Sequence, residues 1–336
     1  MDIYTLKNSK GAEVRISNYG AIVQALYMPD RNGNFEDIVL GYDSLDPYIK
    51  NNPYFGAIVG RFGNRISKGK YTLDGKSYQL TINNGQNSLH GGKNGFDKKV
   101  WDAKEVKSKL GAALKLTYIS PDGEEGYPGN LTLSVLYTLT NKNELKIEYY
   151  AATDMPTILN PTHHSYFNLS GNPGNTILNN IIKINAGKFT PIDSEFIPTG
   201  ELRSVVNTPM DFRKPTAIGS RINKDDEQLK NGKGYDHNFV LINYNGKVRK
   251  AASLFDPLSG RYMEVYTDQP GLQFYSGNFL NGTIIGKRGI TYNYRCGVCL
   301  EAQHFPDSPN EIKFPTVVLR PGEEYHQTTI YKFSTK

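Results

Sequence analysis

Three short segments of this chain carry residues that could transfer protons. His90 precedes two glycines, and His163 and His164 stand together before an aromatic stretch, in a chain with only six histidines. Glu301 lies in a mostly apolar segment near the C-terminus. Imidazole and carboxylate groups exchange protons near neutral pH once burial or neighbouring charges tune them. Such a set could remove one proton and supply another in the same reaction.

Glu301 is expected on a β-strand. Alternation would place Cys299, Glu301 and Gln303 on one face of that strand, with Val298, Leu300 and Ala302 on the other. The pattern alone is equally compatible with an exposed strand that carries a solvated glutamate. The abrupt polar exit at residues 303–307 favours a functional position, because functional residues gather where strands end in loops.

The adjacent histidines are expected to point in opposite directions. Alternation would put His164 on the same face as Tyr166 and Asn168, and His163 on the other face. A regular strand cannot direct both rings into one cavity, so at most one of them is catalytic. A histidine among aromatic residues is more often a core residue than a catalyst, and the pattern alone leaves both roles open.

Three further residues have a binding and a structural interpretation each. The glycines after His90 allow close approach of a ligand, or serve only a tight turn. Arg65 could clamp adjacent hydroxyl groups through its rigid set of donors, or form a structural ion pair. Asp236 could accept a hydrogen bond from a hydroxyl group, or cap a turn.

Composition and charge exclude several classes of protein. The net charge of +6 is scattered along the 336 residues, and the densest basic patch, residues 104–109, is typical of a solvated strand edge. A nucleic-acid site would need basic residues clustered on one face. No apolar run approaches the length of a membrane span, and residues 1–7 lack a signal-peptide layout. We therefore expect a cytoplasmic protein with neither nucleic-acid nor membrane partners.

The two cysteines form a C-x-x-C sequence, Cys296 to Cys299. A redox pair of this kind would start a helix after a strand, whereas this segment resembles a strand that would point the two thiols to opposite faces. No second such pair completes a set of zinc ligands. We expect two reduced, structural cysteines and no metal.

Short strands separated by turn signals dominate the rest of the chain. Hairpins are predicted at residues 71–80, with an Asp-Gly turn, at 131–153, and at 248–267. The best helical candidate is short, at residues 225–230. Many antiparallel strands with few helices indicate an all-β sandwich or barrel. Without a linker or an internal repeat, residues 1–336 are predicted to form a single domain.

At this point the ordered motifs of the chain resemble the aldose 1-epimerase, or galactose mutarotase, family over nearly the whole length. The segments that carry the resemblance are residues 17–21, 40–43, 54–56, 60–66, 87–92, 95–97, 124–129, 164–169, 235–239, 271–275, 300–303 and 319–323. The resemblance implies a large antiparallel β-sandwich of the galactose mutarotase-like supersandwich type. It also implies an enzyme without metal or cofactor that acts on a monosaccharide as a monomer or homodimer.

The resemblance also implies roles for individual residues. Glu301 would be the general base and His164 the general acid, and the sugar would be held by Arg65, His90 and Asp236, with Asn64 and Gln273 as further contacts. Two positions depart from the family pattern, because Gly63 replaces the usual alanine and His163 the common asparagine. Neither departure removes a reacting group.

The implied reaction is the interconversion of α and β hexopyranoses such as D-galactose and D-glucose. It requires the ring to open while a base takes the anomeric proton and an acid protonates the ring oxygen. Three alternatives remain: a hexose-6-phosphate 1-epimerase, a non-catalytic carbohydrate-binding β-sandwich, and a retaining glycosidase that uses Asp236 and Glu301. A glycosidase would need two carboxylates about 5–5.5 Å apart.

Overall fold

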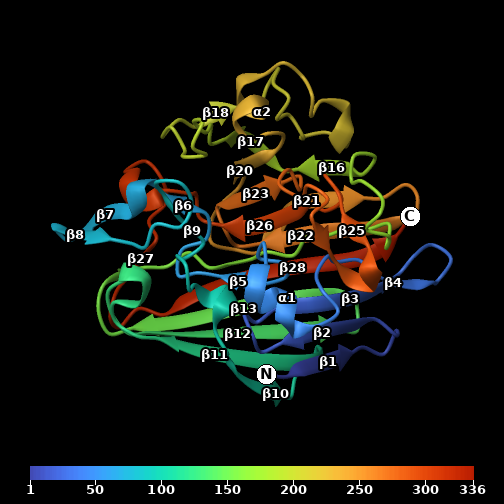
Figure 1. The fold of residues 1–336 in the computed structure, drawn as a ribbon, viewed down its shortest axis with the longest axis horizontal. Helices are drawn as coiled ribbons and strands as arrows, with labels where there is room; N and C mark the ends of the chain where they lie inside the picture. Colours follow the sequence, from blue (N-terminus) through green and yellow to red (C-terminus); the bar gives the residue numbers. More distant parts are fainter.

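The computed structural model describes residues 1–336, apart from the side chain at position 51, and it is built mainly from antiparallel strands (Figure 1). The largest sheet has nine strands. In spatial order they are β10 (Asp102–Val106), β11 (Gly111–Ser120), β12 (Leu131–Thr140), β13 (Glu144–Thr153), β28 (Tyr325–Thr335), β22 (Arg261–Thr267), β21 (Arg249–Phe255), β16 (Ile181–Ile184) and β19 (Thr216–Ala217).

A five-stranded sheet carries three of the seven site residues singled out above, Asp236, Gln273 and Glu301. Its spatial order is β18 (Arg203–Ser204), β17 (Ala186–Phe189), β20 (Asp236–Leu241), β23 (Gly271–Tyr275) and β26 (Cys299–Gln303). The register pairs Gln273 directly with Asn238 on one side and Glu301 on the other. Because side chains alternate along strands, Asp236, Gln273 and Glu301 share one face of this sheet.

The opposite face of β26 packs into the main apolar core. That core also takes in residues of the nine-stranded sheet and of a four-stranded sheet formed by β1 (Ile3–Lys7), β2 (Glu13–Ser17), β3 (Val23–Pro29) and β4 (Phe35–Asp37). Leu300 and Ala302 belong to it, and the Tyr331 hydroxyl of β28 donates to the Leu300 carbonyl at 2.9 Å. Core packing and this hydrogen bond therefore hold β26 in place on the face opposite Glu301.

Smaller elements surround these sheets. The two-stranded pairs are β5 (Ile58–Val59) with β15 (Thr162–His163), β6 (Arg65–Ile66) with β9 (Ser88–Leu89), β7 (Lys70–Leu73) with β8 (Lys76–Gln79), β14 (Thr157–Ile158) with β27 (Val318–Leu319), and β24 (Ile284–Ile285) with β25 (Thr291–Tyr292). Helices α1 (Leu45–Asn51) and α2 (Glu227–Asn231) are short. Short 3-10 turns lie at Ser67–Gly69, Phe96–Lys98, Glu124–Gly126, Ile218–Ser220, Lys287–Gly289 and Ser308–Asn310.

Most expected elements are confirmed. The three predicted hairpins are β7–β8, β12–β13 and β21–β22, and Asp74 and Gly75 adopt the positive φ angles of the predicted tight turn. The helix expected at residues 225–230 is α2, capped by the Asp226 carboxylate on the backbone N–H groups of Gln228 and Leu229. The nearly all-β, antiparallel sandwich architecture is likewise confirmed.

One local expectation is wrong, and one open alternative is excluded. Strand β26 begins at Cys299, so Cys296 lies in the preceding turn and not on the same strand, although both thiols are unpaired and buried as predicted. Strand β26 is also buried on both faces, which overturns the alternative of a solvated Glu301. Within the described residues, no helix has the length and apolar character required to cross a membrane.

Candidate active site

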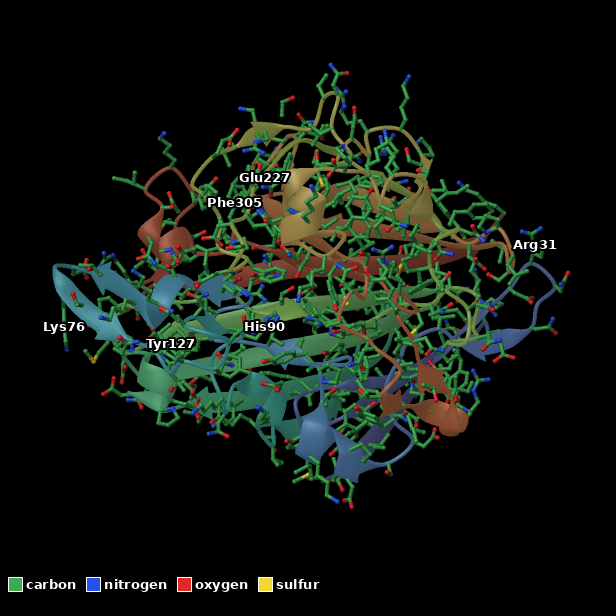
Figure 2. The ribbon with its side chains drawn as sticks, turned by 45° about the horizontal axis from the view of Figure 1, so that its top comes forward. Arg31, Lys76, His90, Tyr127, Glu227 and Phe305 are labelled. Carbon is green, nitrogen blue, oxygen red and sulfur yellow. The ribbon has the colours of Figure 1, made fainter. Side chains whose placement is uncertain are left out.

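One cavity, lined largely by buried side chains, brings together residues that are far apart in the sequence. It has a volume of about 220 Å³ and is lined by Pro53, Tyr54, Asn64, Arg65, Asn84, Leu89, His90, His164, Tyr166, Asp236, Tyr275, Phe279 and Glu301. Six of the seven site residues expected from the sequence line it, and Gln273 is the exception. Figure 2 shows His90 toward the middle of the molecule, while Lys76 at the tip of β7–β8 lies at its edge.

Glu301 offers a buried carboxylate to this cavity. It is 2% exposed, and among the described residues its Oε2 atom accepts no hydrogen bond. Burial raises the pKa of Glu301 well above its ordinary value, with the Asp236 carboxylate raising it further and Arg65 opposing the shift. A carboxylate with a raised pKa is a stronger base than an exposed one, and this strength suits removal of a hydroxyl proton.

His164 faces Glu301 from a separate segment. Two backbone hydrogen bonds hold this residue in place. Its N–H donates to the Ala57 carbonyl at 2.9 Å, and its carbonyl accepts from the Gly56 N–H at 3.0 Å. Its ring stacks with Tyr54 and with Tyr166, at 5.8 and 5.1 Å between ring centres. Packing of this kind holds the imidazole in one orientation toward the cavity.

The two groups form a close acid/base pair. Nε2 of His164 lies 3.7 Å from Oε2 of Glu301. Burial lowers the pKa of His164 to about 4, against a smaller raising effect of its own backbone. Burial thus favours the neutral forms of both groups, which opposes the ordinary preference for a carboxylate beside an imidazolium and lets the proton move between them. This is the property that a reversible proton exchange requires.

His90 is oriented by the loop that holds it. Its Nδ1 accepts a hydrogen bond from the Asn64 backbone N–H at 3.1 Å, so the proton of the neutral ring sits on Nε2. The loop needs glycine next, because a Cβ on Gly91 would lie 1.7 Å from the Gly60 carbonyl oxygen. Burial lowers the pKa of His90 well below its ordinary value, and the nearby His164 and Arg65 lower it further. His90 is therefore a neutral hydrogen-bond donor.

Arg65 and Asp236 supply opposite charges to the cavity. The Arg65 guanidinium lies over the Phe196 ring at 4.6 Å, and its Nε donates to the Asn84 side chain at 2.9 Å. The Gln273 amide donates to Asp236 at 2.6 Å, so Gln273 acts on the cavity by orienting Asp236. Burial raises the pKa of Asp236, while Arg65 and Gln273 lower it.

The cavity also contains three groups of a kind that binds metals. Ligand atoms of His90, His164 and Glu301 lie within 4.8 Å of one another. Two histidines and a glutamate can hold zinc, but each ring must offer a bare nitrogen to the ion. Nδ1 of His90 already accepts the Asn64 N–H, which leaves the proton on Nε2. This tautomer opposes metal binding and favours donation to a ligand hydroxyl.

His163 lies outside the cavity. Its Nε2 is 2.7 Å from the Ser165 hydroxyl, and its ring packs near Tyr137 and Tyr331 in the main core. Burial lowers its pKa to about 3, so the ring stays neutral. The expectation that only one of the adjacent histidines faces the cavity is confirmed, and the departure at position 163 leaves the cavity lining unchanged.

Sequence analysis gave no role to several lining residues, among them Tyr54, Asn84 and Phe279. Tyr54 has a positive φ of 66°, which is unusual for a tyrosine, and its ring lies 4.6 Å from that of His90. The only signal for Asn84 was an Asn-Asn-Gly turn, and Phe279 carries no motif. Their positions depend on loop packing, which a periodic pattern does not encode.

Comparison with known proteins identifies the family. Residues 2–332 match the aldose 1-epimerase family, and the chain belongs to it. It is 48% identical to galactose mutarotase from Bos taurus, covering 96% of this chain and 91% of that protein. It is 38% identical to aldose 1-epimerase from Escherichia coli (strain K12), covering 98% and 94% of the two chains.

Solved structures agree with the family assignment. An aldose epimerase homologue from C. elegans superposes with a TM-score of 0.90 at 31% identity, covering 99% of both chains. Galactose 1-epimerase from Lactobacillus acidophilus superposes with a TM-score of 0.86 at 34% identity, covering 98% of this chain and 93% of that one. The protein is an enzyme of the aldose 1-epimerase class with a galactose mutarotase-like fold.

Proposed function

We propose that this enzyme interconverts the α and β anomers of free hexopyranoses such as D-galactose and D-glucose. The observation that carries the proposal is the buried pair of Glu301 and His164, 3.7 Å apart in one cavity. Relatives named galactose mutarotase and aldose 1-epimerase support the substrate class.

Ring opening uses both members of the pair. Glu301 takes the proton of the anomeric hydroxyl as the bond between C1 and the ring oxygen breaks, and His164 gives its Nε2 proton to that oxygen. The aldehyde turns about the C1–C2 bond, and the hydroxyl adds to its other face. On closing, His164 recovers its proton from the attacking hydroxyl, and Glu301 returns its proton to the carbonyl oxygen.

The remaining residues hold the sugar. His90 donates from Nε2, Asp236 accepts from a sugar hydroxyl, and Arg65 with Asn64 presents further donors. Because these groups are buried, each hydrogen bond to the sugar replaces one to water in a site of low dielectric. Arg65 also balances the negative charge of Asp236 and Glu301.

Polarimetry tests the proposal directly. Fresh α-D-galactose and α-D-glucose should reach rotational equilibrium far faster with the wild type than spontaneously. Glu301→Gln and His164→Asn should each reduce this rate by about 10²–10⁴-fold, the usual contribution of a positioned proton-transfer group. A wild type that leaves the spontaneous rate unchanged would contradict the proposal and direct assays to hexose 6-phosphates, to aryl glycosides and to simple sugar binding.

Three coarser predictions accompany this function. We infer a cytoplasmic location, a monomer or homodimer, and a single domain over residues 1–336. Cell fractionation, light scattering coupled to size-exclusion chromatography, and limited proteolysis test the three in turn.

A further inference from the structure

A buried thiol lies behind the ring of His164. The Sγ atom of Cys299 is 3.6 Å from Nδ1 of His164, on the side of the ring away from the Nε2 atom that faces Glu301. Cys299 and Glu301 stand two residues apart on β26 and share one strand face. The same strand therefore approaches the imidazole at both of its nitrogens.

The proposed reaction restricts which nitrogen can exchange a proton. His164 must lose and regain a proton at Nε2, because that atom faces the cavity. Whenever Nε2 is bare, the neutral ring carries its proton on Nδ1, and that N–H needs an acceptor. Within the described part of the chain, the hydrogen-bonding side chain at Nδ1 is Cys299.

We propose that Cys299 is a positioning residue for His164, whose sulfur accepts the Nδ1–H and so confines proton exchange to Nε2. The inference rests on the proposed role of His164 as the general acid. Burial raises the pKa of Cys299 well above that of an ordinary thiol, so the acceptor is a neutral S–H group.

A thiol suits this position better than the usual partners of catalytic histidines. A carboxylate at Nδ1 would stabilise the imidazolium and make it a weaker acid. A neutral sulfur is a weak acceptor, so it fixes the tautomer without adding to the basicity of the ring. The protonated ring then releases its Nε2 proton readily to the ring oxygen of the sugar.

The other charged and titratable side chains near His164 contact its ring faces, its ring edges or Nε2, and not Nδ1. The rings of Tyr54, Tyr166 and His90 contact the imidazole through their faces or edges, and Glu301 lies at Nε2. Arg65 and Asp236 line the same cavity on other strands. The backbone of His164 itself also favours the protonated ring, so it is a competing acceptor that an experiment must separate from Cys299.

The tautomer of His164 can be measured without any activity. In ¹⁵N-labelled protein, long-range ¹H–¹⁵N correlation spectra distinguish Nδ1–H from Nε2–H rings, and loss of one signal set in His164→Asn assigns this residue. We expect neutral His164 to carry its proton on Nδ1 in the wild type. Cys299→Ala should move that proton predominantly to Nε2, whereas Cys299→Ser, which restores an acceptor, should keep it on Nδ1.

Kinetics provide the second readout. Cys299→Ala should lower kcat about tenfold, the low end of the loss that follows removal of the partner that orients a metal-ligating histidine, and leave KM within about twofold. Cys299→Ser should recover most of kcat. Cys296→Ala is the matched control. Cys296 is also buried and free of a disulfide, but it lies in the turn before β26. This variant should change neither the tautomer nor kcat.

The two proposals fail in different ways. A wild-type proton on Nε2, or an Nδ1 proton that persists in Cys299→Ala, would overturn the role of Cys299 and assign the Nδ1–H to the backbone instead. If Cys299→Ala does not fold, Cys299→Val, which fills the space without offering an acceptor, should move the proton to Nε2 in the same way, and an Nδ1 proton that persists in it would overturn the role of Cys299. A wild type with the expected tautomer but without mutarotation would overturn the proposed function alone.

Discussion

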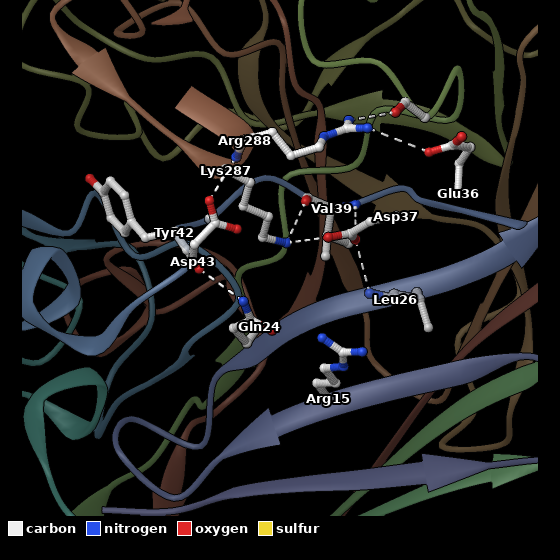
Figure 3. A network of polar contacts seen from close by, with 12 residues as sticks. Arg15, Gln24, Leu26, Glu36, Asp37, Val39, Tyr42, Asp43, Lys287 and Arg288 are labelled. Carbon is white, nitrogen blue, oxygen red and sulfur yellow. Dashed lines mark hydrogen bonds and ion pairs between the residues drawn. The ribbon is translucent and has the colours of Figure 1, made fainter. Parts of the chain in front are cut away.

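Two buried clusters of charge in this protein differ in how well their members are paired. Around Lys287, every charge has a partner: its Nζ donates to Asp37 at 2.6 Å and to the Val39 carbonyl at 2.9 Å (Figure 3). The other oxygen of Asp37 accepts from the backbone N–H groups of Leu26 and Val39. In the cavity, by contrast, Oε2 of Glu301 accepts no hydrogen bond within the described residues.

The two clusters differ in what their charges do: those around Lys287 stabilise the fold, and those in the cavity are available to a ligand. Lys287 connects the segment before β25 to β4 through its ion pair with Asp37. The neighbouring Arg288 adds two contacts, because its backbone N–H donates to Asp43 and its guanidinium pairs with Glu36 (Figure 3). Paired charges of this kind stabilise one arrangement of segments. Groups left unpaired in a cavity carry perturbed pKa values and offer free donors and acceptors to a ligand. Substitutions in the paired cluster should therefore change stability, and substitutions in the cavity should change activity.

The largest effect is expected at Glu301. Glu301→Gln keeps the shape of the side chain and removes the base, so mutarotation should fall by about 10²–10⁴-fold. Removing a buried carboxylate without a hydrogen-bond partner should leave the free energy of unfolding unchanged or raise it. Polarimetry and urea unfolding measure the two quantities. Loss of stability together with activity would assign Glu301 a structural role and remove the contrast between the clusters.

Lys287 should show the reverse pattern. Lys287→Ala leaves Asp37 buried without its ammonium partner, so the free energy of unfolding should fall by about 3–5 kcal/mol. Polarimetry at a temperature where the variant stays folded should give a kcat close to that of the wild type. The double variant Lys287→Met with Asp37→Asn removes both charges, keeps a side-chain oxygen for the N–H groups of Leu26 and Val39, and should recover much of the stability. A kcat loss above about tenfold in folded Lys287→Ala would show that the Lys287 cluster also contributes to catalysis, and would contradict its assignment as purely structural.

The sequence predicted the members of the cavity better than their surroundings. Hairpins β7–β8, β12–β13 and β21–β22 followed from alternation and turn residues, and alternation also placed Glu301 beside Cys299 on one face. It could not show that the face carrying Glu301 is buried too, because that depends on segments from elsewhere in the chain that line the cavity. The contact of His164 with Tyr54 depends on pairing of residues 56–59 with 162–164, which is long-range.

A buried carboxylate without a charged or hydrogen-bonding partner also occurs outside the cavity. Asp97 is 1% exposed, and neither of its oxygens has a side-chain or backbone partner within the described residues apart from its own backbone. Burial raises its pKa to about 6 from an ordinary 3.8. The folded state then binds the proton more tightly than the unfolded chain, so this group costs stability progressively as the pH rises from about 4 to 6.

Asp97→Asn should therefore stabilise the protein at pH 7.5 by about 1–3 kcal/mol. At about pH 4.5 the wild-type group is protonated and the gain should shrink. Urea unfolding at both pH values measures the difference, with Asp46→Asn as an exposed control. An equal gain at the two pH values would mean that the Asp97 carboxyl does not titrate in this range, and a loss of stability would reveal a partner for it.

The smallest effect is expected in the pH dependence of the reaction itself. If the pair of Glu301 and His164 holds one proton, inactivation in acid requires a second proton. The lowered pKa of His164, about 4, delays that step. After subtraction of the spontaneous rate, kcat/KM should change less than about twofold between pH 7.5 and 5.5, whereas a histidine with an ordinary pKa of 6.5 would lose about tenfold. A decline centred near pH 6.5 would show that the cavity leaves His164 unperturbed, and that burial without pairing does not by itself distinguish the reacting cluster from the structural one.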